Sequence, residues 1–354
     1  MKIAQVGTIW ERTPPEFYGG TERIVSNLTD GLVERGHDVT LFATGDSITK
    51  AKLEYVVPEA AYRSGISWEN FLYPLHHISN VFERANEFDL IHMHLNTRQD
   101  YVSLVLAGFV QTPTLFTMHF VLPKENDVKK ADRFNLLTKY RKRNFSTISN
   151  AQRTLDFLNY VGTVYNGIDM TKFPFIADRG EYLVWLGRIC HDKGTKEAID
   201  VAKKSGQKLI LAGKVDEHNS EYLTYFEREV KPHIDGNQIQ FIGEVDDRSK
   251  IELFKKAKVL LNPINWNEPF GLVTVEAMAT GVPVIAFNNG PVKEQIIDGV
   301  TGFVVKNTDE MGEKIDASET LDRKKIRECT VKKFSVDAMV ENYLTMYKSL
   351  IQKK

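Results

Sequence analysis

Short apolar runs typical of β-strands alternate along this chain with stretches of helical periodicity, and this alternation constrains the fold more than any other feature. After the first run, Ile24, Leu28 and Leu32 recur on one face of an expected helix from Thr21 to Arg35, and Gly36 follows as a stop signal. Strands separated by helices form parallel sheets covered on both faces. The first series of expected strands is Lys2–Gly7, Val39–Thr44, Asp89–His94, Thr114–His119 and Phe145–Ser149.

A second series of strands begins after Asn166-Gly167-Ile168-Asp169, and Met170–Gly180 reads as a linker. Its expected strands are Tyr182–Gly187, Lys208–Gly213, Ile239–Gly243, Val259–Pro263 and Pro283–Phe287. The pattern predicts an α/β protein with two doubly wound, Rossmann-like domains, residues 1–166 and 167–335. We expect the last helix, Val336–Gln352 within 336–354, to pack back on the first domain.

Composition narrows the functional classes. The length of 354 residues fits two domains, and a net charge of −1 gives no general attraction to nucleic acid or anionic lipid. Cys190 and Cys329 lie far apart, which argues against a disulfide framework or a zinc site. The opening MKIAQVGTI lacks a signal-peptide pattern, and no apolar stretch is long enough to span a bilayer. We therefore expect a cytoplasmic protein that does not bind nucleic acid.

Ligands of doubly wound sheets bind beyond the carboxyl ends of the strands, so we look for polar residues there. Glu268 and Glu276 bracket Gly271 at an expected helix start, in the segment Glu-Pro-Phe-Gly-Leu-Val-Thr-Val-Glu. A carboxylate such as Glu276 in an apolar helix needs a partner. The two hydroxyls of a ribose would serve, and so would an arginine or lysine in the core. The spacing alone leaves both interpretations open.

Two further segments are suited to a diphosphate. Arg188 offers a bidentate fork and Lys193 a point charge in the loop after the strand that ends at Gly187. The free amides of a helix beginning at Pro269-Phe270-Gly271-Leu272 would face an anion. The alternatives are a surface loop with ordinary cations and an ordinary helix start with proline in its first turn. Because we find neither a metal-ligand cluster nor an Asp-x-Asp sequence, we expect no metal and no cofactor; Asp246-Asp247 reads as a helix N-terminus.

The paired glycines Gly19 and Gly20 follow the first strand and would let a ligand approach the backbone closely. The alternative is a plain turn with Thr21 as the helix N-cap. The sequence is not Gly-x-Gly-x-x-Gly, which disfavours a dinucleotide cofactor and thus a dehydrogenase.

The histidines allow several interpretations. His119 ends an expected strand, where it could bind a sugar, although a lone edge histidine is more often structural. His92 and His94 alternate on one strand and so face one side of the sheet, which favours packing over a metal pair. His76 and His77 read as helix surface.

The segment Lys129–Arg143 carries seven basic residues and only one acidic residue, Asp132. A solvated helix face is the default interpretation. An acceptor-binding patch and a peripheral membrane contact remain open.

Together these segments resemble the family 4 glycosyltransferases, which are retaining enzymes with the two-domain GT-B fold. The resemblance extends along nearly the whole chain. Its motifs are Gly-Gly-x-Glu at 19–22, His119 after a strand, Asn-Gly-Ile-Asp at 166–169, Gly-Arg-x4-Lys-Gly at 187–194, Ala-Gly-Lys at 212–214, Glu-x7-Glu at 268–276, Gly-Val-Pro-Val-Ile at 281–285 and Asp-Gly-x-x-Gly at 298–302. One departure is Gly290-Pro291-Val292-Lys293-Glu294, where the family often has a Pro-Glu pair.

The resemblance implies two Rossmann-like domains facing each other across a cleft and a nucleotide-sugar donor. By position, Glu276 would hold the ribose, and Arg188 and Lys193 the diphosphate, helped by the amides at Phe270, Gly271 and Leu272. Glu268 would contact donor-sugar hydroxyls, and His119 would lie beside the sugar ring. Gly19 and Gly20 would give room for phosphates and acceptor, and Val245 would lie near the base.

The opening residues look most like a bacterial branch labelled UDP-glucose:tetrahydrobiopterin glucosyltransferase, so UDP-glucose is the expected donor. The acceptor, which would be a small molecule, a glycan or a lipid, is not readable from the sequence, nor is the oligomeric state. Rival functions on the same architecture are a sugar-nucleotide epimerase, a phosphorylase and a catalytically degenerate scaffold. The leaving diphosphate would assist deprotonation of the acceptor, since no side-chain nucleophile is evident.

Overall fold

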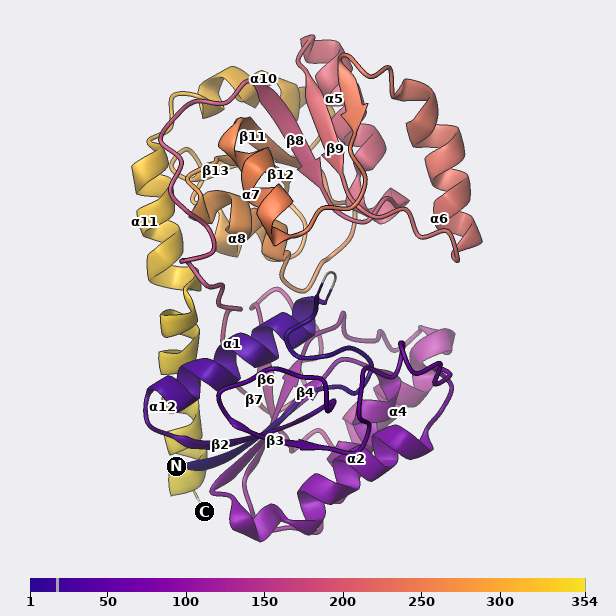
Figure 1. The fold of residues 1–354 in the computed structure, drawn as a ribbon, viewed down its shortest axis with the longest axis vertical. Coiled ribbons are helices and arrows are strands. Elements are labelled where there is room, and N and C mark those ends of the chain that lie inside the picture. Colours follow the sequence, from indigo (N-terminus) through magenta and orange to yellow (C-terminus); the bar gives the residue numbers. More distant parts are fainter. Residues whose placement is uncertain (17–18, 354) are drawn as a thin grey trace. The chain divides into compact units, whose positions relative to one another are not determined.

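The computed structural model describes residues 1–16 and 19–353, and its chain divides into two compact units (Figure 1). The first unit is Met1–Ile168 together with Ser335–Lys354, and the second is Asp169–Phe334. Each unit has one parallel sheet with helices, so the expected fold class of two Rossmann-like α/β domains is confirmed.

The first unit contains a seven-stranded sheet in the order β3-β2-β1-β4-β5-β6-β7. Its strands are β1 Lys2–Val6, β2 Asp38–Ala43, β3 Lys52–Tyr55, β4 Leu90–Leu95, β5 Thr114–Met118, β6 Asn144–Thr147 and β7 Tyr160–Thr163. Its α-helices are α1 Gly20–Glu34, α2 Leu72–Glu83, α3 Val102–Leu106, α4 Ala131–Lys139 and α12 Val336–Gln352. All strand pairs are parallel, so every strand ends at the same edge.

The second unit contains a six-stranded parallel sheet in the order β10-β9-β8-β11-β12-β13. Its strands are β8 Tyr182–Leu186, β9 Leu209–Ala212, β10 Ile239–Phe241, β11 Ala257–Asn262, β12 Val284–Phe287 and β13 Gly302–Val305. Its α-helices are α5 Thr195–Ser205, α6 Ser220–Tyr225, α7 Asp247–Lys255, α8 Leu272–Ala279, α9 Val292–Gln295, α10 Thr308–Ser318 and α11 Arg323–Phe334.

Every strand expected from the sequence is present, but three sheet-edge strands were not anticipated. Lys52–Tyr55 and Tyr160–Thr163 have no fully buried residue, and Gly302–Val305 is only half buried. An edge strand needs no continuous apolar run because one side of it faces solvent or loops. These strands therefore lack the apolar signal that identified the central ones.

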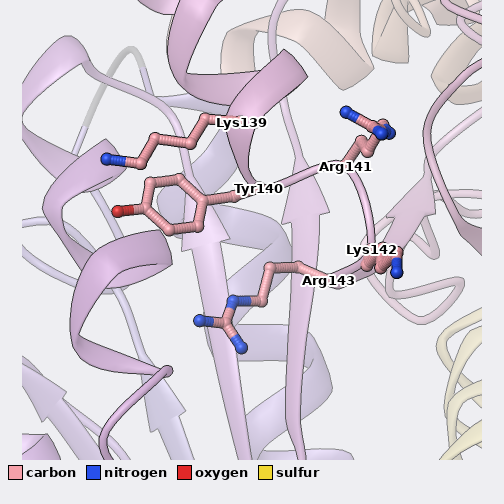
Figure 2. Close-up of a pocket in the computed structure, with 5 residues that line it drawn as sticks. All are labelled: Lys139, Tyr140, Arg141, Lys142 and Arg143. Carbon is pink, nitrogen blue, oxygen red and sulfur yellow. The ribbon is translucent and has the colours of Figure 1, made fainter.

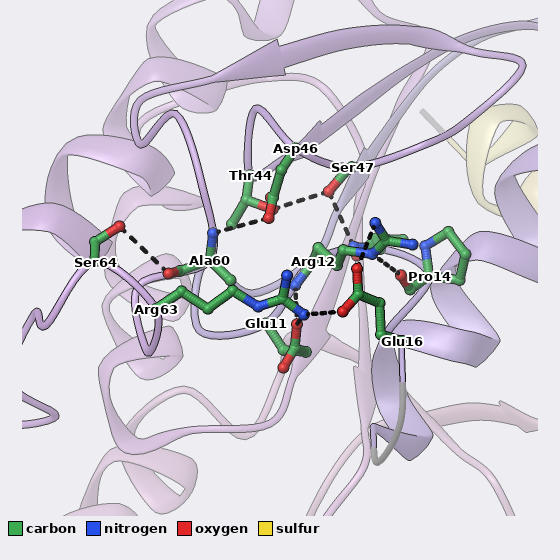
Figure 3. A network of polar contacts seen from close by, with 11 residues as sticks. Glu11, Arg12, Pro14, Glu16, Thr44, Asp46, Ser47, Ala60, Arg63 and Ser64 are labelled. Carbon is green, nitrogen blue, oxygen red and sulfur yellow. Dashed lines mark hydrogen bonds and ion pairs between the residues drawn. The ribbon is translucent and has the colours of Figure 1, made fainter. Parts of the chain in front are cut away.

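A polar network fixes the loop that follows β1 (Figure 3). The amide of Thr13 donates to Ser47 Oγ at 3.0 Å, and Arg63 donates to Glu16 at 2.7 Å. Asp46 accepts from the amide of Ala60 at 3.2 Å. The loop between β1 and α1 is thereby tied to the segments that follow β2 and β3.

One histidine of the first unit, His77, is more buried than the sequence suggested. His77 is 3% exposed and donates from Nε2 to the Gly7 carbonyl at 3.0 Å, so its interpretation as helix surface is wrong. The α2 face that carries it turns toward β1 rather than toward solvent. Burial lowers the pKa of His77 to about 4 and that of His119 to about 3, and it holds the pKa of His92 and His94 well below the usual range.

The first unit should lose stability as the pH falls from 7.5 to 5. Above pH 6.5 these imidazoles are neutral in both states. Below it, the unfolded chain binds protons that the folded unit does not, which costs about 1.4 kcal/mol per pH unit for each histidine. Hydrogen exchange followed by mass spectrometry on first-unit peptides measures the loss. His77→Gln should reduce this pH dependence, whereas replacement of the exposed neighbour, His76→Gln, should keep it; equal profiles for both variants would contradict the prediction.

Candidate active site

The strand order of the second unit reverses between β8 and β11, and the expected donor-site segments follow these two strands. From β8 the sheet extends through β9 to β10 on one side, and from β11 through β12 to β13 on the other. Such a reversal leaves a crevice outside the strand ends, because the connections from the two strands depart to opposite faces. The strand order of the second unit therefore determines where the candidate site lies.

The segment after β8 is a tight turn that carries Arg188 and Lys193. Lys193 lies in a short 3₁₀ turn, and Gly194 follows with φ +69° at the start of α5. A Cβ at Gly194 would lie 1.9 Å from the Pro263 carbonyl oxygen, so only glycine fits. The close approach brings the segments after β8 and β11 together.

Lys193 and Glu268 form an ion pair between these two segments, with side chains 22% and 18% exposed. Lys193 Nζ also lies 5.6 Å from the centre of the Trp266 ring, within cation–π range. The indole of Trp185 donates to the Lys193 carbonyl at 3.0 Å. The lysine is thereby held at backbone and side chain, and its ammonium lies beside one of the predicted site carboxylates.

The segment after β11 is held from the other side by residues that follow β12. Asn289 donates to the Ile264 carbonyl at 2.7 Å, and Gln295 donates to the Phe270 carbonyl at 2.7 Å. Gly290 has φ +56°, and a Cβ there would lie 2.6 Å from the Glu268 carbonyl oxygen. The sequence that departs from the family pattern thus supports the backbone of Glu268.

Helix α8 begins later than both interpretations of Pro269–Leu272 assumed, the anion-binding helix start and the ordinary start with proline in its first turn. Gly271 is the N-cap with φ +83°, and α8 begins at Leu272, so Pro269 precedes the helix and is not in its first turn. Glu268 Oε2 would lie 3.2 Å from a Cβ on Gly271. Phe270 is buried, which anchors the turn. The first amides of α8 are thus close to the Glu268 carboxylate.

Glu276 has a protein partner, Lys250 from α7. The Nζ–Oε2 distance is 2.8 Å, and the two side chains are 13% and 4% exposed. The alternative of a lysine in the core is therefore present in this structure. Asp246 caps α7 by accepting from the Ser249 amide at 2.7 Å, as expected for a helix N-terminus. Lys250 could not be identified as this partner from its position in the sequence, because charged residues surround it in α7.

Two other predicted site residues, Arg188 and Val245, are not part of the Lys193–Glu268 ion pair. Arg188 is half buried, with its guanidinium carbon 6.0 Å from the centre of the Tyr222 ring of α6. Val245 follows β10 and is half buried. Within residues 1–16 and 19–353, no group of three acidic, cysteine or histidine side chains is arranged to hold a metal ion.

In the first unit, Gly19 caps α1 and Gly20 is its first residue, so the alternative of Thr21 as N-cap is wrong. A Cβ on Gly19 would lie 2.7 Å from Pro15 Cβ and 3.1 Å from Glu22 Oε2. Glu22 is buried and accepts from Thr8 Oγ1 at 3.1 Å; burial raises the pKa of its carboxyl group. The sequence pattern marked Glu22 only as part of a motif.

His119 follows β5 at the carboxyl edge of the first sheet and is partly buried. Its Nε2 lies 2.9 Å from Nδ1 of His94, at the end of the neighbouring β4. His92 and His94 share one face, with ring centres 4.1 Å apart, as the alternation predicted. The contact between His94 and His119 was not predictable from the sequence, because only the pairing of β4 with β5 brings them together.

The basic segment Lys129–Arg143 includes a pocket of about 290 Å³ lined by Lys139, Tyr140, Arg141, Lys142 and Arg143 (Figure 2). In Figure 2, Lys139 and Arg143 flank the Tyr140 ring on one side of the segment, while Arg141 and Lys142 lie on the other. Lys139 Nζ and Arg143 Cζ lie 5.4 and 5.7 Å from the ring centre. Arg143 also donates to the Leu104 carbonyl at 3.2 Å, so part of this charge is structural. In the described part of the chain, no helix is both long and apolar enough to cross a bilayer.

Two family models match the chain. The model described as "Glycosyl transferases group 1" matches residues 169–332, and "Glycosyltransferase Family 4" matches residues 18–172. Their junction falls at the division between the two units.

Individual proteins agree with these models. An uncharacterised glycosyltransferase of Methanocaldococcus jannaschii is 25% identical, covering 89% of this chain and 88% of the relative. A glycogen synthase of Mycobacterium tuberculosis is 24% identical, covering 85% of this chain and 81% of the relative. The crystal structure of Anabaena HepE in complex with UDP-glucose has the same fold, with a TM-score of 0.73 and 20% identity over 99% of this chain and all of that one.

Replacing Lys250 by methionine should destabilise the second unit by about 3 kcal/mol, because it leaves the Glu276 carboxylate buried without its cation. Urea unfolding monitored by tryptophan fluorescence measures the change. Lys204→Met is the control, since its partner Asp309 and Lys204 itself are about 70% exposed, and it should stay within about 0.5 kcal/mol of the parent. A Lys250→Met variant as stable as the control would show that the pair is energetically unimportant.

Replacing Gly194 by alanine should destabilise far more than replacing Gly206, although the two have nearly equal φ, +69° and +67°. Both variants incur the left-handed strain of about 1 kcal/mol. Gly206 has no heavy atom within 4 Å of the new Cβ, whereas Gly194→Ala forces the Pro263 carbonyl to move. We expect Gly194→Ala to cost at least twice as much in chemical denaturation, and equal losses would contradict the close approach.

Proposed function

Because the chain is a glycosyltransferase of the GT-B fold with group 1 and family 4 domains, we propose that it transfers glucose from UDP-glucose to an acceptor hydroxyl with retention of configuration. The single observation that carries this proposal is the pairing of Lys193 with Glu268 beside the first amides of α8, at the strand-order reversal of the second unit. The resemblance to a UDP-glucose complex supports the choice of donor.

In this proposal the second unit binds the donor. Lys193 and Arg188 contact the diphosphate, together with the amides at Gly271 and Leu272. An ammonium has three N–H donors, so Lys193 can keep its contact to Glu268 while it binds a phosphate oxygen. The positive end of α8 adds to the same field.

The remaining donor contacts involve groups that are already placed by protein partners. Glu268 accepts from hydroxyls of the sugar. Glu276 accepts from the ribose hydroxyls and is oriented by Lys250. Val245 lies beside the base. A carboxylate fixed by a lysine loses less conformational freedom when it binds a hydroxyl, which favours affinity.

The chemical step breaks the bond between the anomeric carbon and the β-phosphate oxygen, and the bonding electrons leave with the diphosphate. The acceptor oxygen bonds to the anomeric carbon on the face that the diphosphate leaves, and its proton passes to a phosphate oxygen of the leaving group. Cations and helix amides stabilise the charge that develops on the diphosphate. His119 lies beside the developing positive charge of the sugar, and Gly19 and Gly20 leave room for phosphates and acceptor.

A donor screen tests this function. Calorimetry and UDP- or GDP-release assays with UDP-glucose, UDP-galactose, UDP-N-acetylglucosamine and GDP-mannose should show tight binding and slow hydrolysis of UDP-glucose alone. Acceleration by a pterin would identify the acceptor class suggested by the opening residues. Release of UDP from UDP-N-acetylglucosamine without acceptor favours an epimerase, and dependence on inorganic phosphate favours a phosphorylase. Absence of binding to any donor favours a scaffold.

Replacing Lys193 by methionine should lower kcat/KM for the preferred donor by about 100-fold or more, because it removes a cation from the developing diphosphate charge. Lys196→Met is the matched control. Lys196 lies three residues further along the chain, in the first turn of α5, and pairs with Asp200; its loss should change kcat/KM by no more than about twofold. Equal activity of both variants would remove Lys193 from the donor site.

A further inference from the structure

A chain of buried hydrogen bonds runs from His119 into the core of the first unit. His119 Nε2 and His94 Nδ1 are 2.9 Å apart, and His94 Nε2 is 2.9 Å from Gln5 Oε1. Gln5 Nε2 donates to the Tyr347 hydroxyl at 2.9 Å, and that hydroxyl lies 2.6 Å from His92 Nδ1. Gln5, His92, His94 and Tyr347 are at most 1% exposed. These groups are shielded from bulk solvent, and buried polar groups of this kind are hydrogen-bonded.

The chain continues past His92 to the neighbouring strand. His92 Nε2 lies 2.7 Å from Thr117 Oγ1, and Thr117 contacts Ser146 Oγ at 2.5 Å and the Tyr343 hydroxyl at 3.2 Å. These side chains share one face of the sheet, since Gln5 is in register with His92 and His94 with Thr117. Helix α12 brings Tyr343 and Tyr347 onto that face.

The orientation of the Gln5 amide sets the direction of donation along these hydrogen bonds. Because the Gln5 amide nitrogen donates to Tyr347, its oxygen accepts, and His94 must carry its proton on Nε2. The neutral His94 ring then has a lone pair on Nδ1, which accepts from Nε2–H of His119. The Tyr347 hydroxyl, having accepted from Gln5, donates to His92 Nδ1. Burial keeps the pKa of these imidazoles low, so each ring holds a single proton.

We propose that Tyr347, acting through Gln5 and His94, is a positioning residue that fixes His119 as the tautomer protonated on Nε2, with the lone pair of Nδ1 directed to the substrate. Within the described residues, Nδ1 of His119 has no hydrogen-bond partner. A bare Nδ1 accepts a hydrogen bond from a hydroxyl group, and it presents electron density beside a sugar that becomes positive. This inference rests on the proposed function for its catalytic consequence, but not for the tautomer itself.

Tyr347 and Tyr343 lie one turn apart on α12 but differ in their hydrogen-bond partners. Tyr347 is a link between Gln5 and His92, so its hydroxyl both accepts and donates. Tyr343 contacts Thr117 beyond the last histidine, so it lies off the path to His119. Both side chains are fully buried and would lose the same single oxygen on replacement by phenylalanine. Comparison of Tyr347→Phe with Tyr343→Phe therefore distinguishes the loss of the hydrogen-bonded path to His119 from the loss of a buried hydroxyl group.

The test is ¹⁵N NMR of the histidine rings in the full chain without ligand, for the parent, Tyr347→Phe and Tyr343→Phe. The parent and Tyr343→Phe should show His119 protonated on Nε2 alone. In Tyr347→Phe the Gln5 amide has no acceptor and can turn over, so His119 should populate both tautomers. Gln5→Met, which breaks the chain at another point, should give the same mixture. A parent with its proton on Nδ1, or a single unchanged tautomer in Tyr347→Phe, would overturn the proposal.

Kinetics with the preferred donor supply the second measurement. Tyr347→Phe should lower kcat about tenfold or more with the donor KM changed by less than about twofold, and Tyr343→Phe should leave both near the parent. Loss of the single tautomer without loss of kcat would overturn the positioning role. A parent that binds and turns over no nucleotide sugar would instead reject the proposed function, and the NMR result would still decide whether the tautomer is fixed.

Discussion

Parallel strand pairing is the constraint on which this molecule depends. Each parallel pair needs a crossover connection, so all the strands of a sheet end at one edge, where the connections begin. The reversal of strand order between β8 and β11 then brings the segments that carry Lys193 and Glu268 within ion-pair distance, although they lie far apart in the sequence. Likewise, the adjacency of β4 and β5 joins His94 to His119. The local sequence supplies the side chains, and the pairing of strands determines which of them meet.

The central strands were predictable because a strand buried on both faces is a continuous apolar run in the sequence. Helix α12 was predictable because the apolar residues of an amphipathic helix recur with the helical period. Edge strands such as Lys52–Tyr55 escaped prediction because they need neither. His77 was misjudged since one helical position does not show which way the helix turns. The partner of Glu276 was open for a similar reason: the need for a cation follows from burial, but the identity of Lys250 follows from the approach of α7 to α8 in the fold.

The two carboxylates of the candidate site share a physical arrangement. Glu268 and Glu276 each pair with a lysine from a different element, and each lysine is largely covered. Burying a carboxylate without a partner costs free energy, whereas an ion pair with a lysine offsets that cost and fixes the orientation of the carboxylate. The pairing therefore holds two hydrogen-bond acceptors in place, Glu268 just before α8 and Glu276 within it. An electrostatic site gains most from groups that do not need to reorganise when charge develops.

The place of α12 in the chain has a consequence for biosynthesis. Ser335–Lys354 belongs to the first unit but is translated after the entire second unit. The delay between synthesis of the first-unit sheet and synthesis of α12 is therefore on the order of ten seconds. During that interval Gln5 and His92 lack the tyrosine that satisfies them, and the buried polar side chains on this face of the sheet are uncovered. The buried hydrogen bonds between the sheet and α12 can therefore form only after the residues of the second unit have been synthesised.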